Sequence, residues 1–188
     1  MQDDLFGLAG EKVIHNLFFA LLPDATTQAA IQAEASQLRA RHAPRGRWLN
    51  PWRYHMTLHY LGSFAPLQEQ VATAACRAAE AVSAPAFELV LDRAGSFQEA
   101  IGWLGCSQAN PALGQLWESL RAALAHARVR IEGPRNLVPH VTLLRESRDA
   151  LPSQAIEPVS WPVREFVLVD SVLGQRNAYE PLGRWPLA

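Results

Sequence analysis

The chain alternates short apolar runs of strand length with longer segments in which apolar residues recur at helical spacing. The short runs predict strands at residues 13–22, 54–61, 86–93, 101–106, 141–144, 165–173 and 179–185. A capping Asp or an initial Pro followed by helical spacing predicts helices at residues 24–41, 66–82 and 111–128. We expect loops at residues 44–51, 136–139 and the polar, proline-bearing stretch 146–162.

The order of these elements is mixed, with strand–helix pairs followed by two strands, a helix and further strands. Residues 86–93 and 101–106 are expected to pair as a hairpin across residues 94–100. This order predicts an α+β fold with largely antiparallel sheets and excludes a doubly wound parallel sheet.

Composition narrows the class of protein. The chain has 188 residues, of which 49% are hydrophobic, which suits one domain over residues 1–188 with a sizeable core. No apolar stretch approaches the roughly 20 residues of a membrane span, so no membrane partner is expected. Two isolated cysteines and an acidic start at residues 1–4, without a secretory signal, favour a cytoplasmic protein. No interface-like stripe stands out, and a monomer is expected.

The net charge is −1, but basic residues gather in one segment. Residues 39–53 contain no Asp or Glu and hold Arg39, Arg41, His42, Arg45, Arg47 and Arg53. Such a patch can bind a phosphodiester even on a near-neutral protein. A solvated loop after a helix is the alternative.

Two predicted strands carry the same motif, His-x-Thr-Leu, at His55 to Leu58 and at His140 to Leu143. Residues two apart on a strand share a face, so each copy presents an imidazole beside a hydroxyl. The apolar runs 17–22 and 166–173 are each expected to lie beside one motif strand. The repetition predicts two related lobes around a pseudo-twofold axis, with a cleft between them.

Facing strands of this kind suit acid–base chemistry on a phosphate. Imidazole titrates near pH 6.5, so His55 and His140 can supply one base and one acid near neutrality. Attack and departure at phosphorus are in line, which places the two groups on opposite walls. The hydroxyls of Thr57 and Thr142 can donate to the non-bridging oxygens, where charge builds up.

Neighbouring residues extend this candidate site. Arg145, three residues past Thr142, is expected to hold a phosphate oxygen or to pair with Glu146 or Asp149. Four aromatic residues are candidates for base stacking at the rim of the cleft, namely Trp48, Trp52, Tyr54 and Tyr179. For the two tryptophans, packing in the core is the favoured alternative.

His59 would share the face of His55 on a regular strand. The pair invites a metal site, but no third ligand has a recognisable spacing, so we expect no metal and interpret His59 as structural. No phosphate-cradling Gly-rich loop and no Gly-x-Ser-x-Gly motif occurs, and no cofactor is expected.

The segments that carry these features resemble the 2H phosphoesterases, and more closely the bacterial RNA 2′,3′-cyclic phosphodiesterases, also called 2′-5′ RNA ligases. The matching segments are LFFALLPD, RWLNPWRYHMTLHYLG, PHVTLLRES, FVLVDSVLG and YEPLGRWPL, in the family's order. An aromatic residue usually occupies the position of His59 in that family.

The resemblance implies a bilobal fold and hydrolysis of an RNA 2′,3′-cyclic phosphate to a 2′-phosphate end without metal or ATP. It implies a catalytic pair, His55 and His140, with Thr57, Thr142 and Arg145 as phosphate ligands. We assign His140 as base and His55 as acid, although the equivalent motifs leave their order open. The reverse reaction would join a cyclic phosphate to a 5′-hydroxyl as a 2′-5′ linkage.

Two other functions stay open. The substrate could be a small cyclic nucleotide or an ADP-ribose cyclic phosphate. Alternatively, the protein binds RNA ends through the basic patch with little turnover.

Overall fold

The computed structural model describes residues 13–174 and 177–188, so the acidic start at residues 1–4 lies outside it. The strands are β1 (His15–Leu21), β2 (Arg47–Trp48), β3 (Met56–Phe64), β4 (Phe87–Phe97), β5 (Ile101–Gly105), β6 (His140–Arg145), β7 (Gln154–Val163), β8 (Glu165–Val172) and β9 (Pro181–Pro186). The helices are α1 (Ala25–His42), the 3-10 helix η1 (Pro51–Arg53), α2 (Glu69–Glu80) and α3 (Pro111–His126). This confirms the α+β class.

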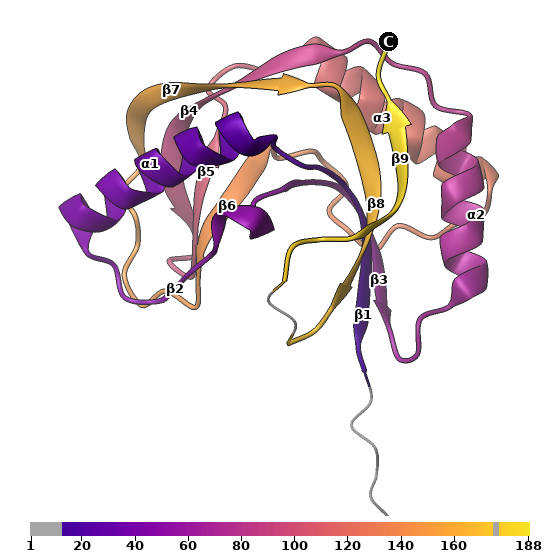
Figure 1. Ribbon diagram of the computed structural model, residues 1–188, viewed down its shortest axis with the longest axis horizontal. Helices are drawn as coiled ribbons and strands as arrows, with labels where there is room; N and C mark the ends of the chain where they lie inside the picture. The colour runs from indigo at the N-terminus through magenta and orange to yellow at the C-terminus, as the bar shows by residue number, and fades with distance from the viewer. Residues whose placement is uncertain (1–12, 175–176) are drawn as a thin grey trace, which may run out of the picture.

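The strands form two antiparallel sheets that curl around a common core (Figure 1). The first sheet has the order β3-β1-β8-β9 and the second the order β2-β6-β5-β4-β7. Helices α2 and α3 lie beside the first sheet, and α1 lies along the second, against β7 (Figure 1). The two predicted lobes therefore correspond to two sheets, each with helices outside.

Helices α1 and α3 begin where the sequence predicts them. The Asp24 side chain accepts a hydrogen bond of 2.7 Å from the backbone N–H of Thr27 and opens α1. Asn110 caps α3 in the same way at 3.0 Å from Leu113 N, and Pro111 occupies the first turn. Helix α2 begins at Glu69, three residues after the predicted start.

The two sheets have a similar order of strands, counted outward from the strand that carries each motif. Motif strand β3 lies next to β1, then β8, then β9, and motif strand β6 lies next to β5, then β4, then β7. A helix joins the first two strands in each set, α1 between β1 and β3 and α3 between β5 and β6. Each of these helices packs on the other sheet, α1 on β7 and α3 on β3. The helices thus link the two sheets.

One pairing prediction is wrong. The run 166–173, now β8, does not lie beside the second motif strand; it pairs with β1 and β9. Strand β5 lies beside β6 instead. A buried apolar run fits several neighbours equally well, so its composition does not select the partner.

The loop prediction for residues 146–162 is also wrong over most of its length, because β7 begins at Gln154. Val159, Trp161 and Val163 alternate toward the core, and Ile156 packs against it beyond a register shift between β4 and β7. Strand β7 lies at the edge of its sheet, beside β4, and an edge strand tolerates prolines such as those at positions 158 and 162. Likewise, β2 forms within the predicted loop 44–51 and pairs with β6.

The predicted hairpin of residues 86–93 and 101–106 is confirmed, with a tighter turn than expected. Strand β4 continues to Phe97, and positive φ angles at Gln98 and Glu99 close the turn. This extension adds Gly95 and Phe97 to the sheet beside the second motif.

No helix in the described part of the chain combines the length and apolar character needed to cross a membrane.

Candidate active site

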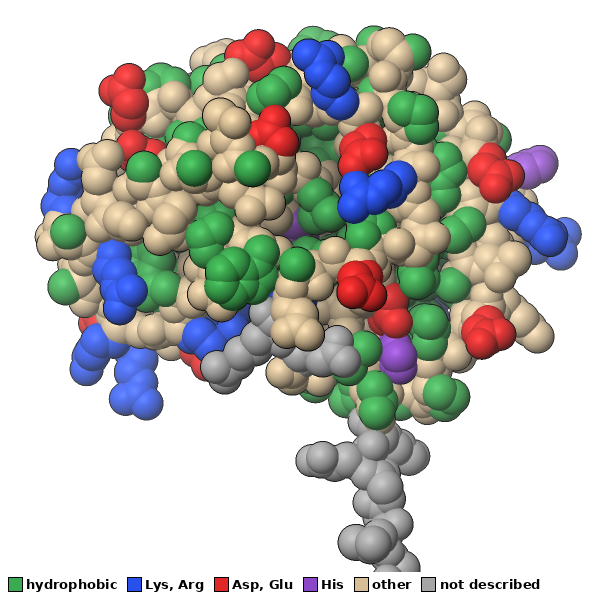
Figure 2. Space-filling view, viewed as in Figure 1, with side chains coloured by type: hydrophobic (Ala, Val, Ile, Leu, Met, Phe, Trp, Pro, Cys, Tyr) green, Lys and Arg blue, Asp and Glu red, His purple; other side chains and the backbone are tan. Residues whose placement is uncertain are grey.

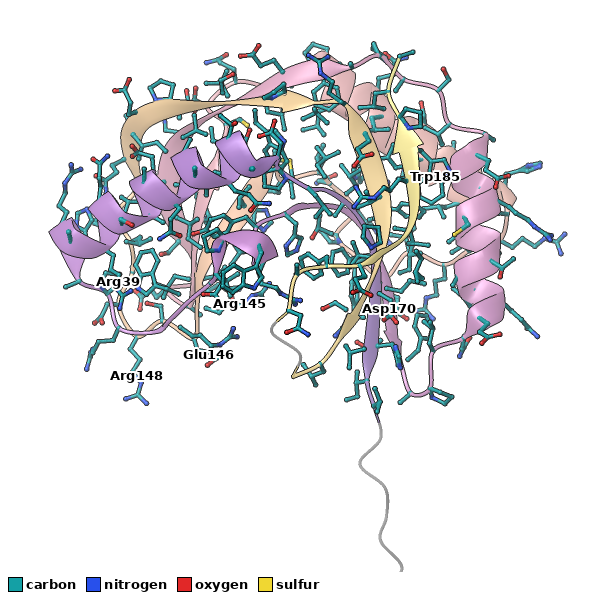
Figure 3. All side chains as sticks on the ribbon, in the orientation of Figure 1. Arg39, Arg145, Glu146, Arg148, Asp170 and Trp185 are labelled. Carbon is teal, nitrogen blue, oxygen red and sulfur yellow. The ribbon has the colours of Figure 1, made fainter. Side chains whose placement is uncertain are left out.

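A cavity of about 780 Å³ opens between the two sheets. Its wall includes Phe18 of β1, Trp48 of β2, His55 directly before β3, Thr57 in β3, and Arg145 at the end of β6. Arg145 lies beneath η1, between the two sheets (Figure 3). Residues from both sheets thus line the predicted cleft.

The ring of His55 is fixed by one hydrogen bond and two aromatic neighbours. Its Nδ1 lies 2.9 Å from the carbonyl oxygen of Arg53. Because a carbonyl only accepts, Nδ1 carries the proton, and Nε2 is left for a ligand. Phe18 and Tyr179 pack on the ring with centroids 5.2 Å away in each case, and the Tyr179 hydroxyl lies 3.3 Å from Nδ1.

His140 is held in the same way. Its Nδ1 donates to the carbonyl oxygen of Val138, two residues earlier, at 2.7 Å. The edge of the ring meets Phe97 at 5.0 Å. Both motif histidines therefore share one tautomer, with Nε2 free for proton transfer.

The pKa values of the two imidazoles are also shifted in the same direction. Burial lowers the pKa of His55 to about 4, and burial likewise lowers the pKa of His140. The positive charge of Arg145 contributes to both pKa shifts, and His140, when protonated, further lowers the pKa of His55. Arg145 is therefore close enough to act on both imidazoles, and both are neutral near pH 7 in the free protein.

The two histidines do not line the same cavity. His140 borders a second, smaller hollow of about 280 Å³, together with Phe97, Trp103 and Arg93. The threonines differ as well. Thr57 is half-buried in the wall of the large cavity, whereas Thr142 is only 6% exposed beside its cross-strand partner Trp103.

The alternative ion pairs expected for Arg145 are not formed. Glu146 pairs with Arg47 at 2.8 Å, and Asp149 pairs with Arg45 at 2.9 Å. Within the described ranges Arg145 has no ion pair, and its side chain lines the large cavity. This leaves its charge available to an anion in the cleft.

The expectation that His59 shares the face of His55 is wrong. A register shift between β1 and β3 leaves Leu58 without a partner, so His59 turns toward the core. It is 2% exposed, its Nε2 donates to the Trp117 carbonyl at 2.8 Å, and its ring packs on Trp117. These contacts support the structural interpretation.

The aromatic candidates divide into two groups. Trp48 and Tyr179 line the large cavity. Tyr54 is 1% exposed and its hydroxyl donates to Gln32, so its assignment to base stacking is wrong. Trp52 is 47% exposed and lies outside the cavity wall.

The basic patch is largely engaged within the protein. Besides the pairs of Arg45 and Arg47, Arg41 donates to Gln154, and the Arg39 guanidinium lies 5.9 Å from the ring of Trp48. Arginine side chains gather where α1 ends and β2 begins (Figure 2). The patch is thus a network that ties α1 and β2 to the loop before β7.

Sequence reasoning placed Arg53 only in the basic patch and missed its role in the cavity wall. Its guanidinium lies 3.9 Å from the Tyr179 ring centroid and donates to Ser171 Oγ at 3.0 Å and to the Asn177 carbonyl at 3.1 Å. Arg53 thus fixes Tyr179 against His55. Phe97 and Trp103 were also missed, because nothing in the sequence links them to the second motif. In residues 13–174 and 177–188, no three His, Cys, Asp or Glu side chains cluster as metal ligands would.

Comparisons with known proteins agree with this arrangement. The model of the 2′-5′ RNA ligase superfamily matches residues 27–175. E. coli LigT in its apo form is 31% identical, with 93% of this chain and 98% of that chain covered and a TM-score of 0.73. LigT has also been solved in complex with 3′-AMP and with phosphate.

Two further solved structures are similar. A protein described as a phosphoesterase is 29% identical over 92% of this chain and 98% of that chain, with a TM-score of 0.74. The protein TT0787 of Thermus thermophilus is 25% identical over 92% of this chain and 97% of that chain, with a TM-score of 0.70. A search of curated protein sequences found no match.

Proposed function

The chain belongs to the 2′-5′ RNA ligase superfamily, and from that premise we propose that it is an RNA 2′,3′-cyclic phosphodiesterase that opens the cyclic phosphate to a 2′-phosphate. The observation that carries the proposal is that His55 and His140 share the same tautomer and the same type of hydrogen bond. Both protonate Nδ1 against a carbonyl two residues earlier, and both feel the charge of Arg145.

The reaction follows from these positions. His140 Nε2 accepts a proton from water as the water oxygen attacks phosphorus. The bond from phosphorus to the 3′-oxygen breaks, and His55 Nε2 donates a proton to that oxygen. The hydroxyls of Thr57 and Thr142 and the guanidinium of Arg145 hold the non-bridging oxygens. The product carries a 2′-phosphate and a free 3′-hydroxyl.

The low pKa values of the free protein leave one proton to be supplied. A phosphodiester anion between the imidazoles favours the charged form of each, so substrate binding raises their pKa values. When the substrate anion binds, one of the two neutral histidines therefore takes up a proton, and this protonated imidazole serves as the general acid. Catalysis thus depends on the negative charge of the bound substrate, because that charge keeps one histidine protonated.

Support for a nucleotide in the large cavity comes from its volume and from the relative. A volume of about 780 Å³ lies in the range of small-molecule sites. LigT has been solved with 3′-AMP, ATP and NADP⁺. Trp48 and Tyr179 offer rings for a base.

The test is product analysis on an oligonucleotide with a 2′,3′-cyclic phosphate end, in the presence of EDTA. The protein should release 2′-phosphate ends. His55→Ala and His140→Ala should each lose at least about 100-fold in rate, because each removes one acid–base group. His126→Ala, an exposed histidine at the end of α3, is the matched control and should retain full rate. A 3′-phosphate product, or near-normal turnover by either motif variant, would contradict the proposal.

A small cyclic nucleotide is the second candidate substrate. The arginines around the cleft entrance are paired with the protein itself, which leaves little free charge along a longer RNA strand. Comparing kcat/KM on a nucleoside 2′,3′-cyclic phosphate, an ADP-ribose cyclic phosphate and a cyclic-ended oligonucleotide separates these substrates. Binding of RNA ends without product would instead indicate an RNA-end binding protein. The monomeric state and the cytoplasmic location stay predictions.

A further inference from the structure

Arg53 lies two residues before the histidine of the first motif, and the proposed hydrolysis does not use its side chain. Helix η1 closes with a hydrogen bond of 3.0 Å from the Tyr54 N–H to the carbonyl of Pro51. The backbone of Tyr54 is extended, with φ −68° and ψ 132°, and its side chain is buried. Because alternate side chains of an extended segment share a face, Arg53 and His55 both face the large cavity.

The Arg53 guanidinium joins η1 to β8 and to the chain that follows it. It donates to Ser171 Oγ at 3.0 Å and to the Asn177 carbonyl at 3.1 Å. The same guanidinium lies 3.9 Å from the centroid of the Tyr179 ring. A planar guanidinium can stack on a ring and donate hydrogen bonds from its edge at the same time. These three contacts therefore fix the position of the Tyr179 ring.

Tyr179 passes this constraint to His55. The two rings meet edge to face, with centroids 5.2 Å apart and an interplanar angle of 84°. The Tyr179 hydroxyl oxygen lies 3.3 Å from Nδ1 of His55, whose proton is donated to the Arg53 carbonyl at 2.9 Å. Arg53 thus acts on one imidazole twice, through its own carbonyl and through the Tyr179 ring. Both contacts are on the Nδ1 side, so together they set the direction of Nε2.

The second motif has the backbone contact but a different set of side chains. Val138 stands two residues before His140, and its carbonyl accepts the hydrogen bond from Nδ1 at 2.7 Å. Val138 carries no charge and is 53% exposed. Phe97 meets the His140 ring edge to face at 5.0 Å and has no hydroxyl. The two motifs are therefore equivalent in sequence but not in their surroundings.

A positive charge also distinguishes the first motif. The Arg53 guanidinium contacts a hydroxyl, a carbonyl and an aromatic ring, which are neutral groups that do not cancel its charge. Burial is the main cause that lowers the pKa of His55, and the charge of Arg53 lowers it further. Val138 can have no such effect on His140.

Resting on the proposed function, we propose that Arg53 is a positioning residue for the reaction: through Tyr179 it holds the His55 imidazole so that Nε2 points at the leaving 3′-oxygen. Arg53 stays on the Nδ1 side and does not touch the reacting atoms. Because the phosphate ligands stay in place without it, its loss affects the chemical step rather than substrate binding. The first motif thus needs a residue that the second motif does not.

The first test is the split between kcat and KM for a nucleoside 2′,3′-cyclic phosphate. Arg53→Gln should lower kcat about tenfold, because a less ordered imidazole is less often aligned with the leaving oxygen. KM should stay within about threefold of the wild-type value. The matched control is Arg121→Gln on α3. The Arg121 guanidinium lies 5.8 Å from the ring of Trp117, which packs on His59, so this control removes a similar arrangement around a histidine outside the cavity wall. It should retain the wild-type kcat and KM.

The second test is the pH dependence of kcat, which a purely structural role would not move. In the proposed reaction His55 is the acid, so kcat falls at high pH as His55 loses its proton. Without the cation the pKa of His55 rises, and this alkaline limb should move to higher pH in Arg53→Gln. Arg53→Lys keeps the charge but not the planar fork, so its limb should match the wild-type profile while its kcat stays low. The other groups that face His55, namely Tyr179, Arg145 and His140, are unchanged in both variants.

A double variant tests whether Arg53 acts through Tyr179. Tyr179→Leu alone should lower kcat, and adding Arg53→Gln should lower it no further, because the two residues form one chain of contacts to His55. Independent roles would instead multiply the two losses.

The outcomes separate this proposal from the proposed function. A rise in KM of about tenfold with unchanged kcat in Arg53→Gln would assign Arg53 to substrate binding and overturn its positioning role. A kcat within about twofold of wild type, an unmoved alkaline limb, or multiplied losses in the double variant would overturn it as well. Where Arg53→Gln does not fold, the kcat and KM of Arg53→Lys decide in the same way. In each case the wild-type protein still opens the cyclic phosphate, and the phosphodiesterase stands. Absence of cyclic phosphate opening by the wild-type protein overturns both.

Discussion

His55, directly before β3, and His59, within it, lie four residues apart, yet their surroundings differ completely. One register shift between β1 and β3 places His55 in the cleft and His59 against Trp117. The imidazole of His59 forms a buried hydrogen bond to a backbone carbonyl, while the Nε2 of His55 keeps its bonding capacity for a ligand. The same residue type thus serves packing at His59 and lines the candidate site at His55.

We expect His59→Ala to destabilise the protein by about 2–4 kcal/mol, because it leaves a cavity beside Trp117 and an unpaired buried carbonyl. Turnover by the folded variant should stay within a few-fold of the wild-type rate. Urea unfolding and initial rates on a cyclic phosphate check this, with His126→Ala as the exposed control. A catalytic role for His59 would be indicated by a stable variant with a large loss of rate.

Stability should fall as the pH drops below about 6.5. The folded pKa of His55 is lowered to about 4, so the unfolded chain binds protons more readily in the window between the two values. The slope is at most about 1.4 kcal/mol per pH unit for His55. Burial lowers the pKa values of His140 and His59 as well, which adds to the loss.

Denaturation midpoints measured from pH 7 to pH 5 test this. His55→Gln should flatten the profile relative to the wild-type protein, while His126→Gln should not. Equal slopes in the wild-type protein and His55→Gln would show that the low pKa of His55 is not a property of the folded state.

At the scale of elements, the two-residue strand β2 decides the shape of the cleft wall. Its residues pair with the end of β6, Arg47 with Arg145 and Trp48 with Leu144. The pairing brings Trp48 into the wall of the cavity that Arg145 also lines. A segment that resembles a loop in sequence thereby becomes part of the candidate site.

We expect Gly46→Ala to disrupt this pairing. Gly46 has φ +149°, and an added Cβ would lie 2.8 Å from Leu144 Cδ1 and 3.0 Å from the Arg145 carbonyl oxygen. The expected cost is about 1–3 kcal/mol of unfolding free energy, with a raised KM for the cyclic substrate. Gly114→Ala in α3 is the matched control: open space surrounds it, and the change should stabilise by about 0.5–1 kcal/mol. A neutral Gly46→Ala would contradict this account.

At the scale of the whole molecule, both sheets contribute to one large hydrophobic cluster. A smaller cluster of Phe18, Ala20, Val167 and Val169 covers the opposite face of the first sheet, behind Tyr179. Because the helices also cross between the sheets, the shared core supports the single-domain organisation expected for residues 1–188. That organisation stays a prediction.

Internal pairing of the arginines predicts a weak salt dependence for RNA binding. Most of the basic patch contacts Glu146, Asp149, Gln154 or aromatic rings, so few phosphates beyond the reacting one find a free cation. We expect log KM for a cyclic-ended oligonucleotide to change with log salt with a slope of about 1 to 2, as for one or two phosphate contacts. Steady-state kinetics between low and physiological salt measure the slope. A slope of about 5 would indicate a long RNA track.

The sequence by itself determined the class of fold and the motif on which the proposed chemistry rests. The repeated His-x-Thr motif, the caps at Asp24 and Pro111, and the mixed order of apolar runs are local features, and local periodicity and capping follow from neighbouring residues alone. The partner of β8, the strand nature of β7 and the orientation of His59 were decided only by tertiary structure. A buried strand accepts several neighbours, an edge strand tolerates proline, and one bulge reverses the face of every later side chain. The hollow beside His140 belongs to the same group, because three strands from distant parts of the chain bring Arg93, Gly105 and His140 into one row.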